Sequence, residues 1–434
     1  MSRLLVRAHK SPFRVASAKK VLNKNLFGSN VGNLVFAQAA IRLLSTESSI
    51  VRTSGLIGQS AHSVNSDHDH VVIPLANAFR PNYGRSLDGL SDLIEKLKIP
   101  VTVVGVGAQA TIEGEYSKRG EELGPTVQRF VRAVLERSPS IGVRGEFTRD
   151  YLVGLGFGDN EIDVIGCPSM FMNGPNLEPT RRVAALEPGS PIALNISPYL
   201  AQMGPVSIDL AERYPNLVYL PQDLRTLNLM VRGHFSMENQ RATVESGVPI
   251  YLDHPLIKSD RIRFCLDPKT WFDHLATYDF SFGTRIHGNI AAVLAGTPAL
   301  VLAHDSRTLE LATYHSIPHR LLPDLEGRVD PIELYADAEW DSMHREHPAL
   351  WDRFAAFLGR HRLRHVFTPG ENPQAFTDQL AATKFPPPVG TLMGLPPAAL
   401  YAMKKELDSL RSHSVRPQVS GLRDRIRGVA AKLR

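Results

Sequence analysis

Arg285 and His287 are the residues of this chain whose types and surroundings point most directly to chemistry. They lie in "YDFSFGTRIHGNIAAVLAG", between Gly283 and Gly288, where an apolar strand pattern gives way to an apolar helix pattern. Free N–H groups and the dipole at a helix N-terminus favour anions. A guanidinium adds a fork that matches carboxylate or phosphate, and an imidazole gives or takes a proton near neutral pH. This pattern predicts proton transfer on an anionic substrate. The local sequence leaves open that Arg285 pairs with a neighbouring acid and that His287 is a core histidine.

A second set of candidates lies in "AHDSRT", at the carboxyl end of the apolar run "PALVLA". Parallel α/β sheets bind ligands at the carboxyl ends of their strands. His304, Asp305 and Arg307 are therefore candidates for the same site as Arg285. Asp305 equally fits the N-cap of the next helix, and both interpretations stay open.

Two further motifs invite a ligand-binding interpretation. "SDHDHVV" holds Asp67, His68, Asp69 and His70, but neighbouring residues of an extended segment point to opposite faces and cannot converge on one ion. We expect no metal there, but a polar loop from which one residue reaches the cleft. "GVGAQA" lacks the glycine spacing and the acid of a nucleotide-binding loop, so we expect close backbone approach there, with Gln109 as a hydrogen-bonding group in the cleft.

These residues must be positioned by alternating strands and helices, the pattern of parallel α/β proteins. Short apolar runs typical of strands buried on both faces recur in two series, which are separated by a linker-like stretch at 174–191. Two such units predict a cleft between the carboxyl ends of their strands. We therefore predict an α/β fold of two parallel-sheet domains that face a cleft, with a helical C-terminal extension. The expected ranges are a basic arm 1–24, domains 25–185 and 186–325, a helical extension 326–400 and a basic amphipathic tail 401–434.

The basic charge of the chain is confined to its two ends. Residues 1–24 carry a net charge of +7 and residues 404–434 carry +6; since the whole chain carries +5, residues 25–403 carry −8. An acidic body argues against a nucleic-acid partner. The ends are either solvated or touch an anionic membrane surface, with 422–433 at the spacing of an interfacial helix.

Composition is that of an ordinary soluble globular protein. No apolar run reaches the roughly 18 residues of a membrane span, and the N-terminus lacks the apolar core of a secretory signal. Cys167 and Cys265 lie in apolar runs and are expected to be buried thiols in a reducing compartment. We expect a cytoplasmic protein, with peripheral contact at the inner membrane face as the alternative that the basic ends leave open.

The stretch "FGTRIHGNIAAVLAGTPALVLAHDSRTLELATYHSIP" resembles the C-terminal signature of the polysaccharide pyruvyl transferase family. That signature combines Arg-x-His, a helix of small residues, Gly-x-Pro, a strand and an Asp-x-Arg or Asp-x-Lys element. Further pieces follow the order of the family over residues 28 to 320: "GSNVGNLVFAQAAIRLL" (28–44), "VTVVGVGAQ" (101–109), "SIGVRGEFTRDYLVGLGF" (140–157) and "IDVIGCPSMF" (162–171).

The resemblance implies transfer of a pyruvate unit from phosphoenolpyruvate to a sugar, with formation of a cyclic ketal and release of phosphate. It implies a pair of Rossmann-like domains in a GT-B-like arrangement, with phosphoenolpyruvate and a glycan or lipid-linked sugar acceptor as partners. Since the anion-binding groups in the sequence are arginines and helix termini, we expect no cofactor and no metal. Matched to the motifs, Arg144 and Arg285 would bind the donor from opposite domains, and His287 would be the acid that protonates the methylene carbon. Two other classes stay open: a glycosyltransferase that uses a nucleotide sugar on the same scaffold, and a carbohydrate-binding relative without activity.

The sequence departs from the family pattern at two places. Many members carry an acid after the N-terminal Asn-x-Gly turn, whereas this chain has Asn33 there, which can only hydrogen-bond a sugar. Gly145 separates Arg144 from Glu146, where an Arg-Glu pair is expected. A base or acceptor-binding acid at the first position is therefore in doubt.

Overall fold

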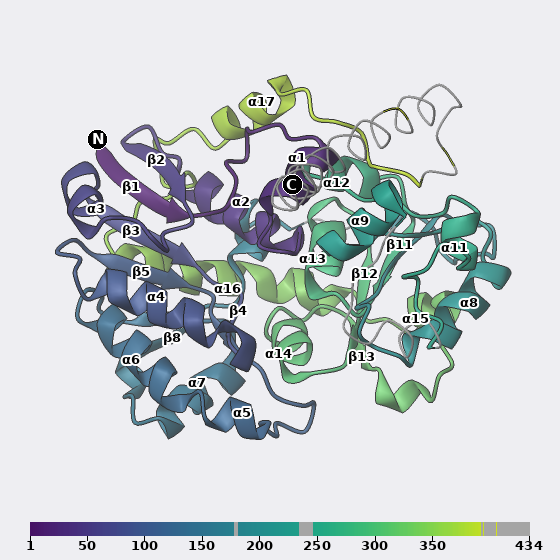
Figure 1. Cartoon of the computed structure of the whole chain (residues 1–434), viewed down its shortest axis with the longest axis horizontal. Coiled ribbons are helices and arrows are strands. Elements are labelled where there is room, and N and C mark those ends of the chain that lie inside the picture. Colours follow the sequence, from purple (N-terminus) through teal and green to yellow (C-terminus); the bar gives the residue numbers. More distant parts are fainter. Residues whose placement is uncertain (178–180, 234–245, 392–393, 395–404, 406–434) are drawn as a thin grey trace, which may run out of the picture.

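The structure is a computed structural model that describes residues 1–177, 181–233, 246–391, 394 and 405. The chain forms two α/β units, each built on a parallel β-sheet (Figure 1). We call them the N-terminal unit and the C-terminal unit. The expected fold class, two parallel-sheet domains with a helical C-terminal region, is confirmed.

The sheet of the N-terminal unit has the order β2-β1-β3-β5, and all its strands are parallel. Backbone hydrogen bonds from Gly105 and Val106 to the carbonyl of Gly142 extend it to the parallel pair β7-β8. A short parallel pair, β4-β6, lies beyond its carboxyl edge. The strands are β1 (Ser2–Arg7), β2 (Ser49–Ser54), β3 (His70–Pro74), β4 (Asn77–Phe79), β5 (Val101–Val104), β6 (Gly107–Ala108), β7 (Ile141–Val143) and β8 (Ile162–Val164).

The prediction of a basic arm over residues 1–24 is wrong. Strand β1 lies inside the sheet, where Leu4 is in register with Val51 of β2 and with His70 of β3. The short apolar run "LLV" is buried there, while the arginines on each side of it are accommodated at the ends of the strand. Counting charge over the whole segment concealed this strand, since three consecutive buried residues carry no charge signal.

Side-chain alternation along the strands divides the core of the N-terminal unit between two faces. Leu5 of β1 packs in a cluster with α4 (Gly84–Ile94) and α6 (Gly124–Leu135). Its neighbours Leu4 and Val6 pack on the other face against α2 (Gly32–Leu44) and α16 (Asp341–Arg360). The smaller helices of this unit are α1 (Ala18–Lys24), α3 (Ala61–Asp67), α5 (Lys118–Glu121) and α7 (Glu146–Gly154).

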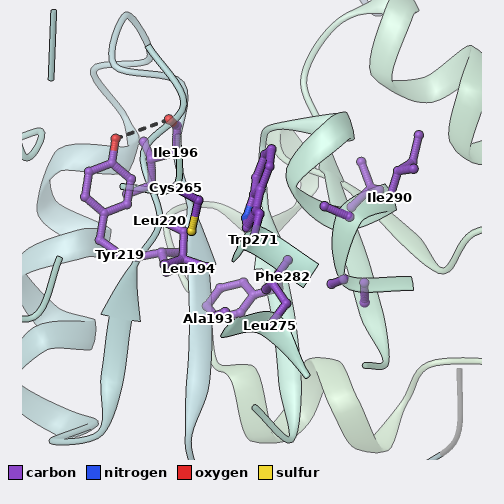
Figure 2. Packing of buried hydrophobic residues seen from close by; sticks show 14 of the residues in the cluster. Ala193, Leu194, Ile196, Tyr219, Leu220, Cys265, Trp271, Leu275, Phe282 and Ile290 are labelled. Carbon is purple, nitrogen blue, oxygen red and sulfur yellow. Dashed lines mark hydrogen bonds between the residues drawn. The ribbon is translucent and has the colours of Figure 1, made fainter. Parts of the chain in front are cut away.

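The sheet of the C-terminal unit has the order β10-β9-β11-β12-β13, again all parallel. Trp271 is 2% exposed and packs in its core between the sheet and Ile290 (Figure 2). The elements are β9 (Ile192–Asn195), β10 (Leu217–Tyr219), β11 (Phe280–Gly283), β12 (Ala299–Ala303), β13 (His319–Leu321), α8 (Met203–Arg213), α9 (Leu224–Arg232), α11 (Pro255–Lys258), α12 (Pro268–Leu275), α13 (Ile286–Leu294) and α14 (Ser306–Tyr314).

Two short apolar runs, residues 248–253 and 262–267, have the sequence pattern of buried strands but do not form strands. Residues 248–253 lie in a turn region, because the sequence continues directly into the His254 cap and Pro255 that begin α11. Residues 262–267 make only isolated bridges, at Ile262 and Phe264. A short apolar run can be buried against helices as well as in a sheet, so periodicity alone did not distinguish the two.

The C-terminal region is helical and returns to the N-terminal unit. It contains α15 (Pro331–Ala336), α16 and α17 (Gln374–Ala382). Met343, in the first turn of α16, belongs to the core of the C-terminal unit, while Phe354 and Phe357 pack in the core of the N-terminal unit with residues of its sheet. Figure 1 shows α16 running from one unit to the other. Helix α16 therefore ties the two units together. The expected tail 401–434 lies outside the described residues, apart from residue 405.

Helices capable of spanning a bilayer are absent from the part of the chain that the structure describes. Both cysteines are buried and free, as expected.

Candidate active site

A cavity of about 830 Å³ lies between the two units, at the carboxyl ends of β1, β9, β11 and β12. We call it the central cavity. Of the residues singled out above, those that line it are Asn33, Arg144, Arg285, His287, His304 and Arg307. A second, more open hollow of about 570 Å³ lies between α12 and residues 383–388, away from these side chains.

Arg285 is held at the junction of β11 and α13, where it is the N-cap residue. Its backbone N–H donates to Oδ1 of Asn195, at the end of β9, over 2.8 Å. The two flanking glycines permit this approach. A Cβ on Gly283 would lie 1.9 Å from the carbonyl oxygen of Asn195, and a Cβ on Gly288 would lie 2.6 Å from the amide of Gln222. The glycine bracket in the sequence is thus a packing requirement of the site.

His287 lies in the first turn of α13 and is partly exposed. Its ring centroid is 5.6 Å from that of Phe36, and its Nε2 is 3.8 Å from Sγ of Cys167. Burial lowers the pKa of His287 to about 3, and the charges of Arg144, Arg307 and Arg285 lower it further in that direction. His287 is therefore neutral at pH 7 in the free protein. An acid at this position must acquire its proton when an anion arrives.

Arg144 follows β7 and reaches the central cavity from the N-terminal unit. It is 2% exposed, its Nε has no hydrogen-bond partner, and burial lowers its pKa. Its Nη2 makes one long contact of 3.4 Å, to the carbonyl oxygen of Gly105. A Cβ on Gly107 would lie 2.3 Å from Cδ of Arg144, so this glycine gives the guanidinium its path. Among the described residues no carboxylate forms an ion pair with Arg144, although the charge of Glu310 partly offsets the lowering of its pKa. A buried cation of this kind is suited to an anionic ligand.

Gly145, the departure from the Arg-Glu pattern, makes room for a carboxylate from the other unit. Glu310 of α14 accepts hydrogen bonds from the N–H of Thr148 at 2.7 Å and from its Oγ1 at 3.0 Å. Thr148 is in the first turn of α7, and the N-cap residue Gly145 has no side chain that could accept a hydrogen bond from that turn. A Cβ on Gly145 would lie 2.3 Å from Cγ of Glu310. Burial raises the pKa of Glu310 to about 7.

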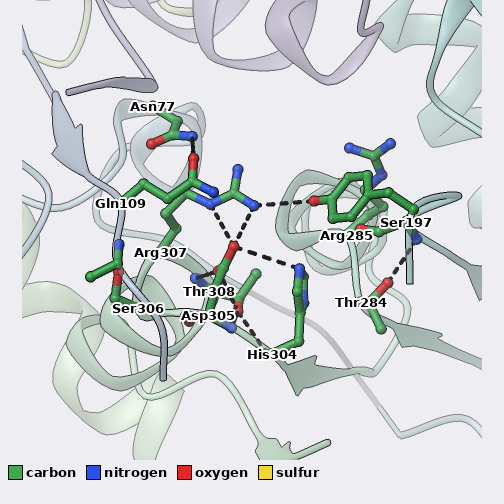
Figure 3. A network of polar contacts seen from close by, with 12 residues as sticks. Asn77, Gln109, Ser197, Thr284, Arg285, His304, Asp305, Ser306, Arg307 and Thr308 are labelled. Carbon is green, nitrogen blue, oxygen red and sulfur yellow. Dashed lines mark hydrogen bonds and ion pairs between the residues drawn. The ribbon is translucent and has the colours of Figure 1, made fainter. Parts of the chain in front are cut away.

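Asp305 caps α14 and also holds Arg307 in place (Figure 3). Its Oδ1 accepts from the N–H of Thr308 at 3.0 Å, and its Oδ2 accepts from Nε of Arg307 at 2.7 Å. Asp305 does not itself line the central cavity, whereas Arg307 and His304 do. Burial lowers the pKa of His304 to about 4. Of the two interpretations of Asp305, the structure shows the N-cap, with an added ion pair.

Asn33 and Gln109 are occupied by protein partners. The Asn33 amide donates to the carbonyl of Phe27 at 2.8 Å, although the residue does line the central cavity. Oε1 of Gln109 accepts from Nδ2 of Asn77 at 2.9 Å, and Asn77, not Gln109, is at the cavity wall (Figure 3). Gln109 thus positions a cleft residue.

The segment 67–70 sends no residue into the cleft, so that expectation is wrong. Asp69 pairs with Arg3 at 2.7 Å, and the buried His70 contacts Thr102. The segment adjoins β3 at its amino end, opposite the edge at which the cavity lies. Among the residues that the structure describes, no group of three or more His, Cys, Asp or Glu is placed to hold a metal ion.

Sequence reasoning missed Asp223 and Tyr199, which both line the central cavity. Asp223 lies 3.9 Å from Nη2 of Arg285 and forms a backbone bridge with Asn30, in the turn that lacks the expected acid. The ring of Tyr199 lies 5.6 Å from the Arg285 guanidinium, and its hydroxyl accepts from Arg307 at 3.2 Å. Burial raises the pKa of Tyr199, but Arg307 and Arg285 outweigh that effect and lower it overall. Both residues follow strand-like runs, and this position was the available signal.

The fold and the site define the class: a GT-B-like protein with a cationic cavity between its two parallel-sheet units. A family profile described as polysaccharide pyruvyl transferase matches residues 10–306. The chain belongs to this family of transferases. A comparison with curated proteins gave no match.

Three solved structures are similar to the chain at low identity and with TM-scores below 0.5. UDP-GlcNAc 2-epimerase from Methanocaldococcus jannaschii is 10% identical with a TM-score of 0.46, covering 82% of this chain and 99% of that one. Anabaena HepE, solved with UDP-glucose, is 10% identical with a TM-score of 0.41, covering 88% and 99%. A protein of uncharacterised function from Klebsiella pneumoniae is 12% identical with a TM-score of 0.39, covering 72% and 88%. At such TM-scores nothing about activity follows from these similarities.

Proposed function

We propose that this transferase moves a pyruvate unit from phosphoenolpyruvate to two hydroxyls of a sugar residue, on a glycan or a lipid-linked oligosaccharide. The product is a cyclic ketal, and inorganic phosphate is released. Family membership supports pyruvyl transfer in general. The donor, the ketal and the roles of the residues below are the finer parts of the proposal.

The observation that carries the proposal is the convergence of cations from both units on one imidazole. Arg144 comes from the N-terminal unit and Arg285 from the C-terminal unit, and the charge of each lowers the pKa of His287. Phosphoenolpyruvate carries a carboxylate and a phosphate, which together match two guanidinium groups.

Donor binding prepares the acid. The negative charge of phosphoenolpyruvate offsets the arginines that keep His287 neutral, so His287 takes up a proton from solvent as the donor binds. His287 then protonates the methylene carbon of the donor. The carbon–carbon double bond becomes a methyl group, and C2 becomes an oxocarbenium-like centre.

A sugar hydroxyl attacks C2, and its proton needs an acceptor. Asp223 is the carboxylate at the cavity wall among the described residues, beside Arg285. We assign it the role of general base. A second hydroxyl then attacks C2, and the bond from C2 to the phosphate oxygen breaks. Of the two hydroxyl protons, one is balanced by the proton that enters the methyl group, and the other leaves with the phosphate.

The test is release of phosphate from phosphoenolpyruvate by the full chain across a panel of oligosaccharide and lipid-linked acceptors. The proposal expects phosphate release that depends on both donor and acceptor. Hydrolysis of a nucleotide sugar by the same preparations, with phosphoenolpyruvate inert, would instead assign a glycosyltransferase activity. Binding of glycans without turnover of either donor would leave a carbohydrate-binding protein.

A further inference from the structure

The central cavity holds more positive charge than a donor requires. Six arginines line it, against one carboxylate among the described lining residues, Asp223. Arg307 is paired with Asp305, and the proposed donor is matched by Arg144 and Arg285. Of the other three arginines, Arg225 is exposed, whereas Arg7 and Arg80 are partly buried and have no assigned role.

Both of these arginines lie at the N-terminal unit's side of the cavity, next to one tyrosine. Arg7 ends β1, and its Nη2 donates to the hydroxyl of Tyr83 at 2.7 Å. Arg80 follows β4, and its guanidinium carbon lies 5.7 Å from the ring centroid of Tyr83. Tyr83 therefore sets the two guanidinium groups on a common wall. Arg7 lies at the carboxyl end of β1 and Arg80 at the carboxyl end of β4, so both reach the cavity from strand ends.

Neither guanidinium has a carboxylate partner in the described part of the chain. Nε of Arg7 is buried without a hydrogen-bond partner, and Nε of Arg80 donates to the carbonyl of Asn77 at 3.0 Å. Burial lowers the pKa of Arg80, and electrostatic repulsion by Arg307 lowers it further. Partly buried cations that contact only neutral oxygens leave a charge deficit that an anionic ligand corrects.

We infer that Arg7, Arg80 and Tyr83 form a second anion subsite, which binds the charged group of the sugar acceptor. This inference rests on the proposed function, since it assigns the donor to Arg144 and Arg285. The group it fits has phosphate or carboxylate oxygens, which guanidinium forks bind in the same way. The acceptor is then a sugar that bears phosphate or an acidic sugar, and a neutral glycan alone would leave the subsite empty.

Calorimetric titration of the full chain, saturated with phosphoenolpyruvate and without an acceptor, tests this subsite. The probes are inorganic pyrophosphate, glucuronate and neutral glucose. We expect one of the two anions to bind while the donor is bound, and glucose not to bind. Pyrophosphate alone would identify a phosphate-bearing acceptor, and glucuronate alone an acidic sugar. Arg7→Gln and Arg80→Gln should each raise the Kd of the anion that binds by about tenfold or more, because each variant loses a charged hydrogen bond to it.

Matched variants separate the subsite from general effects. Arg52→Gln removes an exposed arginine from the neighbouring strand β2 and should leave anion binding unchanged. Arg7→Lys keeps a cation if Arg7→Gln proves unstable, and melting temperatures identify such a case. The donor's Kd should stay within about twofold in the Arg80→Gln variant, because Arg80 is placed outside the donor contacts.

The outcomes distinguish the inference from the proposed function. Two results would overturn the second subsite and leave the donor proposal standing. The anions could bind only by displacing phosphoenolpyruvate, or they could bind the two glutamine variants as tightly as the wild type. Failure of phosphoenolpyruvate to bind at all would instead overturn the proposed function. Loss of anion binding in Arg7→Gln and Arg80→Gln, with donor binding intact, is the result we expect.

Discussion

His287 is neutral in the free protein, and this single property decides how the site must work. Burial and three nearby arginines lower its pKa to about 3. In the proposed mechanism, the charge of the bound donor offsets those arginines and His287 then takes up a proton. The proposal thus gives the arginines two roles, to bind the donor and to keep the imidazole uncharged until the donor binds.

We predict that binding of phosphoenolpyruvate at pH 7 is accompanied by proton uptake. Calorimetry in buffers of different ionisation enthalpy measures the number of protons taken up. The wild type should take up more than His287→Gln, by a difference that approaches one proton, while the variant still binds the donor. Equal uptake in the two proteins would remove His287 from the role of acid.

Asp223→Asn tests the general base. Asp223 caps α9 through the N–H of Thr226 at 3.2 Å, and asparagine caps helices about as well as aspartate. The variant should keep its stability and donor binding and lose about 10²–10⁴ in rate of phosphate release.

The matched control is Asp267→Asn. Asp267 caps α12 through Thr270 in the same way, but outside the central cavity. Phosphate release should be unchanged there. A similar loss of rate in both variants would show that Asp223 acts only as a helix cap.

The residues of the site were predictable to different degrees. Arg285 and His287 stand out because glycines bracket them between a strand and a helix, and the structure explains each glycine by a close approach. Asp223 and Tyr199 occur singly after strands, and only the fold brings them to Arg285. Gln109 could not be assigned from sequence, since its contact with Asn77 depends on the pairing of β4 with β6.

At the scale of elements, the two units are joined at the site by a helix cap that crosses between them. Glu310 of α14 completes the first turn of α7 in place of an N-cap side chain. Arg144, to which we assign donor binding, comes just before Gly145, the N-cap of α7, so the contact fixes this arginine relative to the C-terminal unit. The close approach of Glu310 requires a glycine at position 145, and this explains why Gly145 separates Arg144 from Glu146 here, where the family pattern has an Arg-Glu pair.

We predict that Gly145→Ala displaces Glu310 and weakens donor binding. The added Cβ would lie 2.3 Å from Cγ of Glu310, an overpacking that typically costs about 1–3 kcal/mol. Chemical denaturation and donor titration measure the two effects. Gly154→Ala is the control, since a Cβ there meets nothing within 4 Å at the other end of α7. Unchanged stability and donor affinity in Gly145→Ala would contradict the account of this contact.

At the scale of the whole molecule, six buried or partly buried neutral histidines make the fold sensitive to acid. Burial lowers the pKa of each, to about 3 or about 4, in the folded state. The unfolded chain protonates them near the ordinary value of 6.5, so the free energy of unfolding should fall as pH drops from about 6.5 towards 4. Each can contribute up to about 1.4 kcal/mol per pH unit. They are His70, His254, His287, His304, His315 and His361.

Glu310 acts in the opposite direction. Its pKa is raised to about 7 in the folded state, so its protonation adds stability as pH falls from about 7 to 4.5. One group does not offset six. Urea unfolding at pH 7.5, 6.5, 5.5 and 4.5 should show a steady loss of stability below 6.5. A free energy of unfolding that is constant over this range would contradict the burial of these histidines.

The basic C-terminal end carries a separate prediction that rests on sequence alone. Residues 404–434 carry a net charge of +6, and an anionic membrane surface attracts such a segment. Sedimentation with anionic vesicles should be salt-sensitive and should disappear when residues 404–434 are deleted. Equal sedimentation of the full and the truncated chain would leave the tail merely solvated.

The organisation of the whole chain was predictable where hydrophobic patterns are long and was missed where they are short. Both parallel sheets follow from repeated apolar runs. Strand β1 was hidden by surrounding charge, and the position of α16 under the N-terminal sheet depends on contacts between Phe354, Phe357 and distant strands. No local pattern encodes such contacts, because they are set by the packing of the complete core.

Turnover in deuterated water tests the central claim most directly. Protonation of the donor's methylene carbon by an acid that exchanges with solvent should place one deuterium in the methyl group of the ketal. Mass spectrometry of the product and a phosphate assay, with each acceptor of the panel, measure both quantities. The account predicts a singly deuterated pyruvyl group and one phosphate released per ketal formed. A ketal whose methyl group carries no deuterium would contradict this account. So would transfer of a sugar residue to the acceptor while phosphoenolpyruvate releases no phosphate.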